Sequence, residues 1–243
     1  MPSNRRAFLK SCAPMVIGSL AGCNVQGSVD PADTTSTSRG SDDLKLGEET
    51  SLYSGQIAVN RIWVQQMVVA MEASAHTEVY ASEGEQYVIA DISAKEIDAN
   101  SSSVRNAVKL DLGGTTYEPL NKHLSQHTTT SGRVAIPYAV PRDISASTGH
   151  VVLETDQNER DARWQLDGKT TSILAKPPRF TVNRFAVPDQ AKGNDSIDVL
   201  LTIENAGKSD GSFIAEIGST ELSDQAEFNF SVSSGEETTK TVP

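Results

Sequence analysis

The chain has 243 residues, of which 32 are acidic and 21 basic, so its formal net charge is −11. Such an excess of negative charge excludes the basic footprint of a nucleic-acid-binding protein and repels anionic membrane surfaces. Hydrophobic residues make up 37% of the chain and aromatic residues 5%. This composition is enough for one or two modest hydrophobic cores.

Residues 1–23 have the pattern of an export signal. Arg5, Arg6 and Lys10 precede a weakly apolar run at residues 13–20, which is shorter than the roughly 20 residues that span a bilayer core. The run ends in Leu-Ala-Gly-Cys, whose cysteine is Cys23. This start resembles a twin-arginine signal ending in a lipobox. The resemblance implies lipidation of Cys23 and anchoring at the outer face of the cell membrane. A plain secretory signal, with Cys23 incidental, is the alternative.

Removal of residues 1–23 would take away three basic side chains and no acidic one, so the mature chain would carry a charge near −14. The other cysteine, Cys12, would leave with the signal, which excludes an internal disulfide and a cysteine-bound metal. Acidity spread along the whole chain, together with the signal type, resembles exported proteins of halophilic archaea. An ordinary acidic secreted protein is the alternative.

Residues 24–43 are rich in Ser, Thr and Asp and have almost nothing to bury, so they are expected to form a disordered tether. Such a chain spans on the order of 25 Å between its ends.

Residues 44–175 are expected to form an immunoglobulin-like β-sandwich. Short runs rich in Val, Ile and Thr alternate with polar residues and predict about eight strands. The segment Glu83-Gly84-Glu85 predicts a turn before a half-buried strand, and Pro137 limits its own strand to an edge or a bulge. The expected strands are 55–64, 67–71, 88–94, 108–112, 115–117, 134–138, 151–153 and 164–166.

Two segments of this region resemble a known family. They are Glu-Gly-Glu-Gln-Tyr-Val-Ile-Ala-Asp-Ile at residues 83–92 and Ser-Gly-Arg-Val-Ala-Ile-Pro-Tyr-Ala-Val-Pro at residues 131–141. Over most of residues 50–167 the chain resembles an extracellular immunoglobulin-like domain of unknown function found in secreted lipoproteins of bacteria and archaea. The resemblance implies a fold and an exterior location, and no catalytic residues. Glu96-Ile97-Asp98 departs from the family's pattern, which places an Asn after the strand.

After a proline spacer at residues 176–178 the pattern starts again, in a second unit at residues 179–243. Val182-Asn183-Arg184 repeats Val59-Asn60-Arg61 at an offset of 123 positions, which predicts an internal repeat. The next strands also match, with Ile197, Val199, Leu201 and Ile203 set against Val88, Ala90, Ile92 and Ala94. Residues 203–213 resemble the bacterial cell-adhesion-related sandwich domain.

The second unit is expected to be incomplete. Residues 234–243 match residues 131–141 of the first unit, and no strands equivalent to 151–153 and 164–166 follow. About five strands would remain, and a sheet that lacks its last strands has an unpaired edge. That edge is expected to pack on the first domain or to accept a strand from a partner. A shortened or wrongly terminated reading frame is the alternative. The predicted fold is therefore all-β, with two immunoglobulin-like antiparallel β-sandwiches in tandem.

Few side chains point to chemistry. His123 and His127 would face one way on a helix, where they could bind a metal, but a surface loop is expected. Residues 156–161 offer oxygens for Ca²⁺ but lack the glycine of a calcium loop, so a solvated hairpin is expected. Trp63 and Trp164 are expected in the core, with a ligand platform as the alternative. No nucleophile elbow and no phosphate loop is present in the sequence. No catalytic, metal or cofactor site is therefore expected.

Asn100 and Asn194 stand in expected loops within N-glycosylation acceptor patterns, whereas the pattern at Asn229 falls inside an expected strand. Taken together, the sequence favours a lipid-anchored, non-enzymatic surface protein that binds an envelope protein or a glycan. A substrate-capturing or accessory subunit of a surface enzyme or transporter is the alternative, and a hydrolase whose residues meet only in three dimensions is the third candidate.

Overall fold

A computed structural model of the chain describes residues 41–73, 76–97, 102–124, 132–154, 161–188, 198–217 and 226–242. All of them belong to one of the two compact units into which the chain divides, Arg39–Pro243. The expected export signal lies outside the described residues, as does the expected tether up to residue 40. The last residues of that tether prediction are wrong, because a strand already begins at Ser41.

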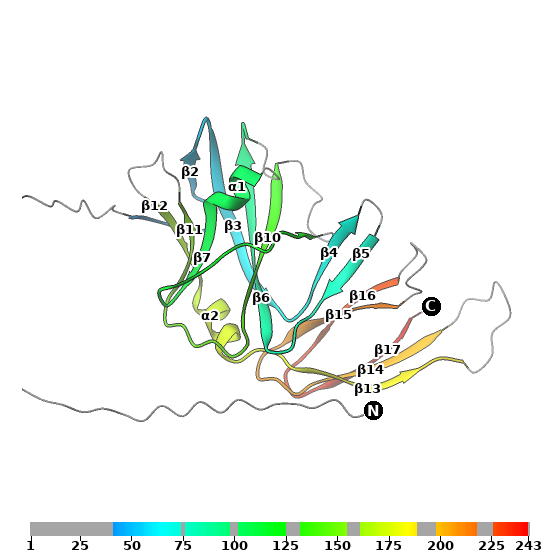
Figure 1. The fold of residues 1–243 in the computed structure, drawn as a ribbon. Helices are drawn as coiled ribbons and strands as arrows, with labels where there is room; N and C mark the ends of the chain where they lie inside the picture. The colour runs from blue at the N-terminus through cyan, green and yellow to red at the C-terminus, as the bar shows by residue number, and fades with distance from the viewer. Residues whose placement is uncertain are drawn as a thin grey trace, which may run out of the picture. The chain divides into compact units, whose positions relative to one another are not determined.

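Two sheets form the first sandwich (Figure 1). The four-stranded sheet has the order β10 (Arg133–Pro141), β6 (Glu85–Lys95), β3 (Gly55–Gln65) and β2 (Glu49–Leu52), all antiparallel. The five-stranded sheet has the order β1 (Ser41–Leu44), β12 (Asp161–Gln165), β11 (Gly149–Leu153), β7 (Val108–Leu112) and β8 (Thr115–Tyr117), in which β1 runs parallel to β12. The all-β fold predicted from alternation is confirmed. Pro137 lies in β10, an edge strand, as predicted.

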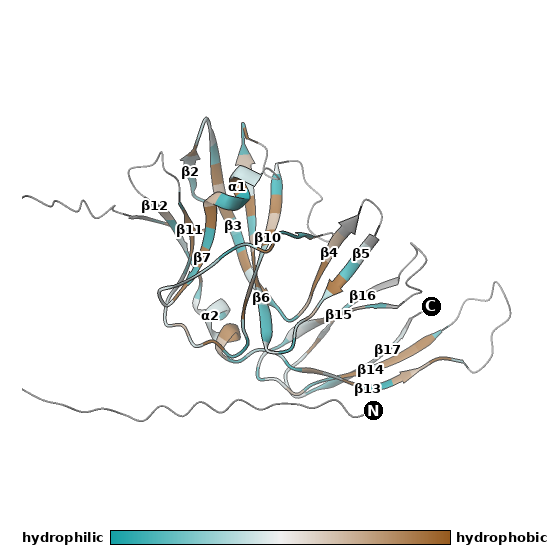
Figure 2. Cartoon of the chain, viewed as in Figure 1, coloured by the Kyte–Doolittle hydropathy of each residue, from teal (hydrophilic) through white to brown (hydrophobic). Residues whose placement is uncertain are grey.

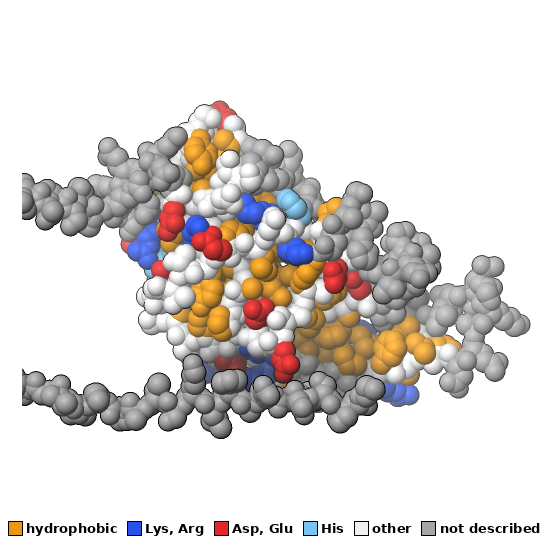
Figure 3. Space-filling model, in the orientation of Figure 1, with side chains coloured by type: hydrophobic (Ala, Val, Ile, Leu, Met, Phe, Trp, Pro, Cys, Tyr) orange, Lys and Arg blue, Asp and Glu red, His pale blue; other side chains and the backbone are white. Residues whose placement is uncertain are grey.

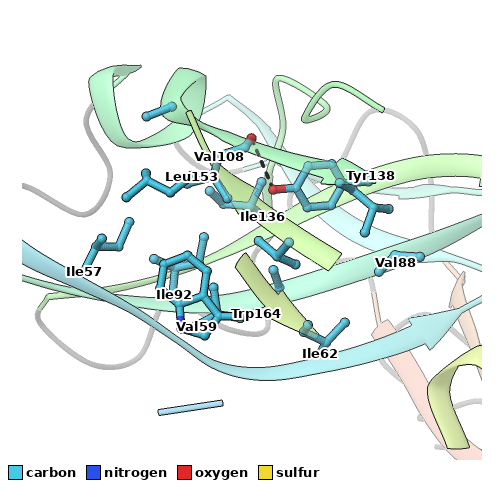
Figure 4. Close-up of a cluster of buried hydrophobic side chains, with 14 of the residues drawn as sticks. Ile57, Val59, Ile62, Val88, Ile92, Val108, Ile136, Tyr138, Leu153 and Trp164 are labelled. Carbon is cyan, nitrogen blue, oxygen red and sulfur yellow. Dashed lines mark hydrogen bonds between the residues drawn. The ribbon is translucent and has the colours of Figure 1, made fainter. Parts of the chain in front are cut away.

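The main core lies between these two sheets and draws its side chains from both (Figure 4). Trp164 of β12 is fully buried in it, and its indole Nε1 donates to the carbonyl oxygen of Glu48 at 3.0 Å. Tyr138 of β10 donates its hydroxyl to the carbonyl oxygen of Val108 in β7, which bridges the two sheets. Burial raises the pKa of the Tyr138 hydroxyl far above its ordinary range, so the group stays a neutral donor.

A third sheet covers the outer face of the four-stranded sheet. It has the order β5 (His76–Tyr80), β4 (Val68–Ala73) and β9 (His123–Leu124). A second apolar cluster forms beneath it, to which β6 contributes Tyr87 and Ile89. Because Val88 and Ala90 face the main core, residues 86–90 of β6 are buried on both faces. The prediction of a half-buried strand is wrong for this half, because alternation along one strand does not show that another layer covers its far face. From Asp91 to Lys95 buried residues alternate with half-buried or exposed ones, as predicted.

Two short helices were not predicted. They are α1 (Ser102–Ala107) and α2 (Gly168–Ala175). Asp167 caps the start of α2, where one of its carboxylate oxygens accepts the backbone N–H of Thr170 at 2.6 Å. Neither helix, among the described residues, is long and apolar enough to cross a membrane.

Five strands form the second sandwich in the described residues. One sheet has the order β13 (Phe180–Ala186), β14 (Val199–Asn205) and β17 (Glu237–Val242), and the other pairs β15 (Gly211–Ile217) with β16 (Ala226–Val232). Its small core contains Leu201, Ile203, Phe213 and Val232. The predicted all-β architecture is confirmed, and the incompleteness of the second sandwich stays a prediction.

The internal repeat extends to backbone irregularities. The ladder between β3 and β6 shifts register at Asn60, and the ladder between β13 and β14 shifts at Asn183. Val59 stands opposite Ile92 before the first bulge, and Val182 stands opposite Ile203 before the second. By strand pairing, Ile203 of the second sandwich is therefore equivalent to Ile92 of the first. The sequence analysis had matched Ile203 with Ala94, two positions further along the strand.

The two prolines at 177–178 do not form a free spacer. Both are buried, and the chain passes so close to Gly207 that a Cβ there would lie 2.5 Å from the Pro177 carbonyl oxygen. The backbone N–H of Ala206 donates to the carbonyl oxygen of Arg179 at 2.8 Å. This proline segment is packed against the second sandwich.

Candidate functional site

The site residues expected from the sequence fall outside the described residues. This holds for Arg5, Arg6 and Cys23 of the signal and for the glycosylation candidates Asn100 and Asn194. They stay predictions.

The structure describes only part of the two candidate metal sites. His123 is exposed and lies in β9, a strand, so the helical spacing that would align it with His127 does not apply. Residues 155–160 lie outside the described residues, as does His127. The described residues contain no group of three or more His, Cys, Asp or Glu side chains placed to hold a metal.

The two tryptophans differ. Trp164 lies in the core as predicted. Trp63 is partly exposed, and the guanidinium of Arg61 lies over its ring at 4.9 Å from the centroid. The pair lines a cleft of about 330 Å³, together with Val64, Gln65, Asp210, Gly211, Ser212 and Ser231.

A second cleft contains a buried cation. Arg105 is 6% exposed, and its Nη1 donates to the carbonyl oxygens of Leu120 and Lys122 at 3.0 and 3.2 Å. Burial lowers the pKa of the Arg105 guanidinium. These two hydrogen bonds hold the segment before β9 against α1, so the buried Arg105 guanidinium has a structural role.

Exposed apolar side chains gather on β13 and just after its end. Val182 pairs with Ile203 and Phe185 with Leu201, so both share the inward face of their sheet with core residues. Nevertheless the side chains of Val182, Phe185 and Val187 are 50%, 54% and 51% exposed. We call these three residues the open face. Figures 2 and 3 show hydrophobic residues gathered over β13 and β14.

The equivalent residues of the first sandwich are buried. Val59 and Ile62, which correspond to Val182 and Phe185, are only 0% and 7% exposed. They belong to the main core, which also holds Val151 of β11 and Trp164 of β12. In chain order and pairing, β15 and β16 correspond to β7 and β8. Among the described residues, no strand of the second sandwich takes the places of β11 and β12.

An aromatic cluster joins the two sheets of the second sandwich. The ring of Phe213 in β15 lies 5.7 Å from that of Phe180 in β13 and 5.6 Å from that of Phe230 in β16. Within the described residues the ladder given for β15 is the one with β16.

Only part of this site could be predicted from the sequence. The repeat predicted a second unit without counterparts of β11 and β12 and with an unpaired sheet edge, and that absence stays a prediction. The apolar face was missed, because apolar residues at 182, 185 and 187 are also what a buried strand with a bulge at Asn183 would have. Only their match to buried residues of the first unit, combined with the missing cover, could have identified them.

Comparison with known proteins gives one fold likeness. No family model matches the chain, and no curated protein matches it. Among solved structures, an uncharacterized β-sandwich protein from Clostridium difficile 630 aligns at 14% identity and a TM-score of 0.36, over 52% of this chain and 96% of that one.

Proposed function

We propose that this chain is an exported, lipid-anchored protein of the outer cell surface, without enzymatic activity, whose second sandwich binds another envelope protein. The observation that carries the binding role is the open face, where Val182 and Phe185 of the core-facing strand β13, and Val187 just after it, are about half exposed. Exposed apolar surface in a soluble protein marks an interaction site more often than chance.

The anchoring role is supported by the sequence alone. Arg5 and Arg6 fit a twin-arginine signal, and Cys23 fits the lipid-accepting position of a lipobox. Two acyl chains on Cys23 would hold a soluble domain durably at a membrane, because each buried CH₂ contributes about 0.8 kcal/mol. In this proposal the anchor restricts the partner to the envelope.

Two measurements test the proposal. Mass spectrometry of native protein should find a lipidated Cys23 at the N-terminus, and Cys23→Ser should release the chain from membranes. Affinity capture from intact envelopes should then enrich a specific protein on the wild-type chain and lose it with Phe185→Ser. An intact Met1 on a cytosolic species, or no specific partner, would refute the proposal.

A second candidate rests on the cleft beside Trp63. Its volume of about 330 Å³ lies in the range of small-ligand sites, and its lining combines an aromatic ring with Arg61, Gln65 and Asp210. This lining suits a glycan or another polar small molecule, which favours the role of a substrate-capturing or accessory subunit. A rise in melting temperature with such a ligand, lost in Trp63→Ala, would support this candidate.

A further inference from the structure

A cleft of the first sandwich is lined by a buried cation without a counter-ion. We infer that this cleft, beside Arg105, binds a small hydroxylated organic acid, whose carboxylate faces the guanidinium and whose hydroxyl groups meet the polar lining. The cleft has a volume of about 450 Å³, within the range of small-ligand sites. Four polar residues line it beside Arg105 and Glu118, namely Ser102, Asn106, Asn121 and His123. The inference rests neither on the open face nor on the anchor.

The guanidinium of Arg105 has one nitrogen left without a partner. Its Nη1 donates to the carbonyl oxygens of Leu120 and Lys122, whereas Nη2 is buried and has no hydrogen-bond partner in the described part of the chain. A buried donor without a partner destabilises a fold, and a charged donor does so more strongly. A carboxylate is the group whose charge and shape complement a guanidinium. A ligand with a carboxylate would therefore supply what the fold lacks at Nη2.

Neighbouring groups do not offset this charge. Among the described residues no acidic side chain forms an ion pair with Arg105. Glu118 lines the same cleft, but both of its carboxylate oxygens accept from the Nζ of Lys109. The Tyr138 phenol interacts electrostatically with Arg105 but stays neutral, because burial raises its pKa. The counter-charge can instead enter from solvent through the cleft.

Size and charge select the class of ligand. One buried positive charge is offset by one negative charge, so a monocarboxylate fits better than a phosphate, which carries more negative charge at neutral pH. The chain's net charge of −11 repels an acidic polymer, which favours a small acid. The Ser102 hydroxyl and the Asn106 and Asn121 amides can both donate and accept hydrogen bonds, as the hydroxyl groups of a sugar require. A sugar acid such as glucuronate combines these features.

The cation is held in place, whereas the polar lining can adjust to a ligand. Two carbonyl oxygens hold Nη1 of Arg105, which fixes the guanidinium before a ligand arrives. The side chains of Ser102, Asn106, Asn121 and His123 are exposed. Rotamer changes of such side chains commonly accompany binding. A carboxylate would thus meet a fixed charge, and the amides would close around the rest of the ligand.

The test titrates the full chain with glucuronate at about pH 7, where the carboxyl group of this sugar acid is ionised. Its methyl ester is the matched control, because it has the same ring hydroxyl groups and no charge. NMR shifts of the backbone amides of residues 105, 106, 121 and 123 report binding. Glucuronate should shift them to saturation, and the ester should not. Acetate, which has no hydroxyl group, should bind about fivefold more weakly. Inorganic phosphate should also bind more weakly than glucuronate.

Four variants connect this binding to the cleft. Glu118→Gln removes the acidic side chain of the lining and should tighten glucuronate binding about threefold. Glu49→Gln makes the same change in another ion pair, with Lys95 and outside the cleft, and should leave binding unchanged. Asn121→Ala should weaken binding about threefold, and Arg105→Met should abolish it. A purely structural role of Arg105 would not make binding depend on Glu118. Unchanged melting temperatures would show that the variants fold.

Several results would overturn the inference. One is equal binding of the acid and the ester, and another is no saturable shift up to about 20 mM glucuronate, which would leave a buried water as the partner of Nη2. Acetate or phosphate that binds as tightly as glucuronate would also overturn it. So would wild-type affinity in Arg105→Met. If that variant does not fold, Glu118→Gln and Asn121→Ala decide, and wild-type affinity in both overturns the inference.

Discussion

Val59→Ala and Val182→Ala form a pair of identical changes at equivalent positions of the two repeats. Both valines precede the bulged Asn, and each stands opposite an Ile. Val59 is 0% exposed and Val182 is 50% exposed. The first substitution should destabilise its sandwich far more than the second.

The expected difference follows from burial. Replacing Val by Ala removes two carbon groups, which contribute about 1.6 kcal/mol when they are fully buried. At Val59 the void left in the packed core adds about 1 kcal/mol, for a total of about 2.5 kcal/mol. At Val182 half of the side chain already meets water, so about 0.8 kcal/mol is lost and no closed cavity forms.

The two substitutions need different probes. Trp63 and Trp164, the two tryptophans of the chain, both lie in the first sandwich, so urea unfolding followed by fluorescence reports the effect of Val59→Ala. Hydrogen exchange of the β14 amides reports the effect of Val182→Ala. Equal losses in the isolated chain would refute the reasoning, because they would mean that something covers Val182 without a partner.

Three further outcomes are expected. Gly207→Ala should cost about 3 kcal/mol by thermal unfolding, because the added Cβ would meet backbone atoms of the proline segment and of Arg179 that cannot move aside singly. Asp167→Ala should cost about 1 kcal/mol through loss of the N-cap of α2. The hydrogen bond that this carboxylate accepts from a backbone N–H lowers the pKa of Asp167 in the folded chain. The ionised cap therefore stabilises the fold fully above about pH 4, the pKa of an unfolded Asp, and this stabilisation should be lost as the pH falls through the lower pKa of the folded chain. Burial, and after it the adjacent Arg163 guanidinium, lowers the pKa of the His150 imidazole. Below about pH 6.5 His150 is therefore protonated in the unfolded chain before it is protonated in the folded one. Stability measured by urea unfolding should therefore fall as the pH drops from 7.5 to 5.5, and His150→Gln should flatten that slope.

Strand positions were readable from the sequence because alternation is a local property. Val108, Leu110 and Leu112 alternate with polar residues, and all three are buried in β7. The repeat of Val-Asn-Arg also held, down to the bulge at the Asn. The residues that a strand buries on one face can thus be predicted from the sequence of that strand alone.

Layering between distant segments could not be predicted in that way. The double burial of β6 depends on β4 and β9, and β9 lies far from β6 in the chain. The two helices are short, and tertiary contacts hold them, such as the bond from the Gln86 amide to the Leu174 carbonyl oxygen. The exposure of the open face depends on what packs over β13, and the residues of a strand carry no signal of whether another layer covers them.

The parallel pairing of β1 with β12 has a mechanical consequence. Ser41 lies opposite Asp161 and Leu44 opposite Trp164, so both strands run from the same end of the sheet. Tension between the chain before β1 and the chain after β12 would pull the two strands lengthwise in opposite directions. Their hydrogen bonds would then carry the force together, in shear, instead of opening one after another like a zipper. A first sandwich tied down at one end and held by a bound neighbour at the other would resist stretching best along that line.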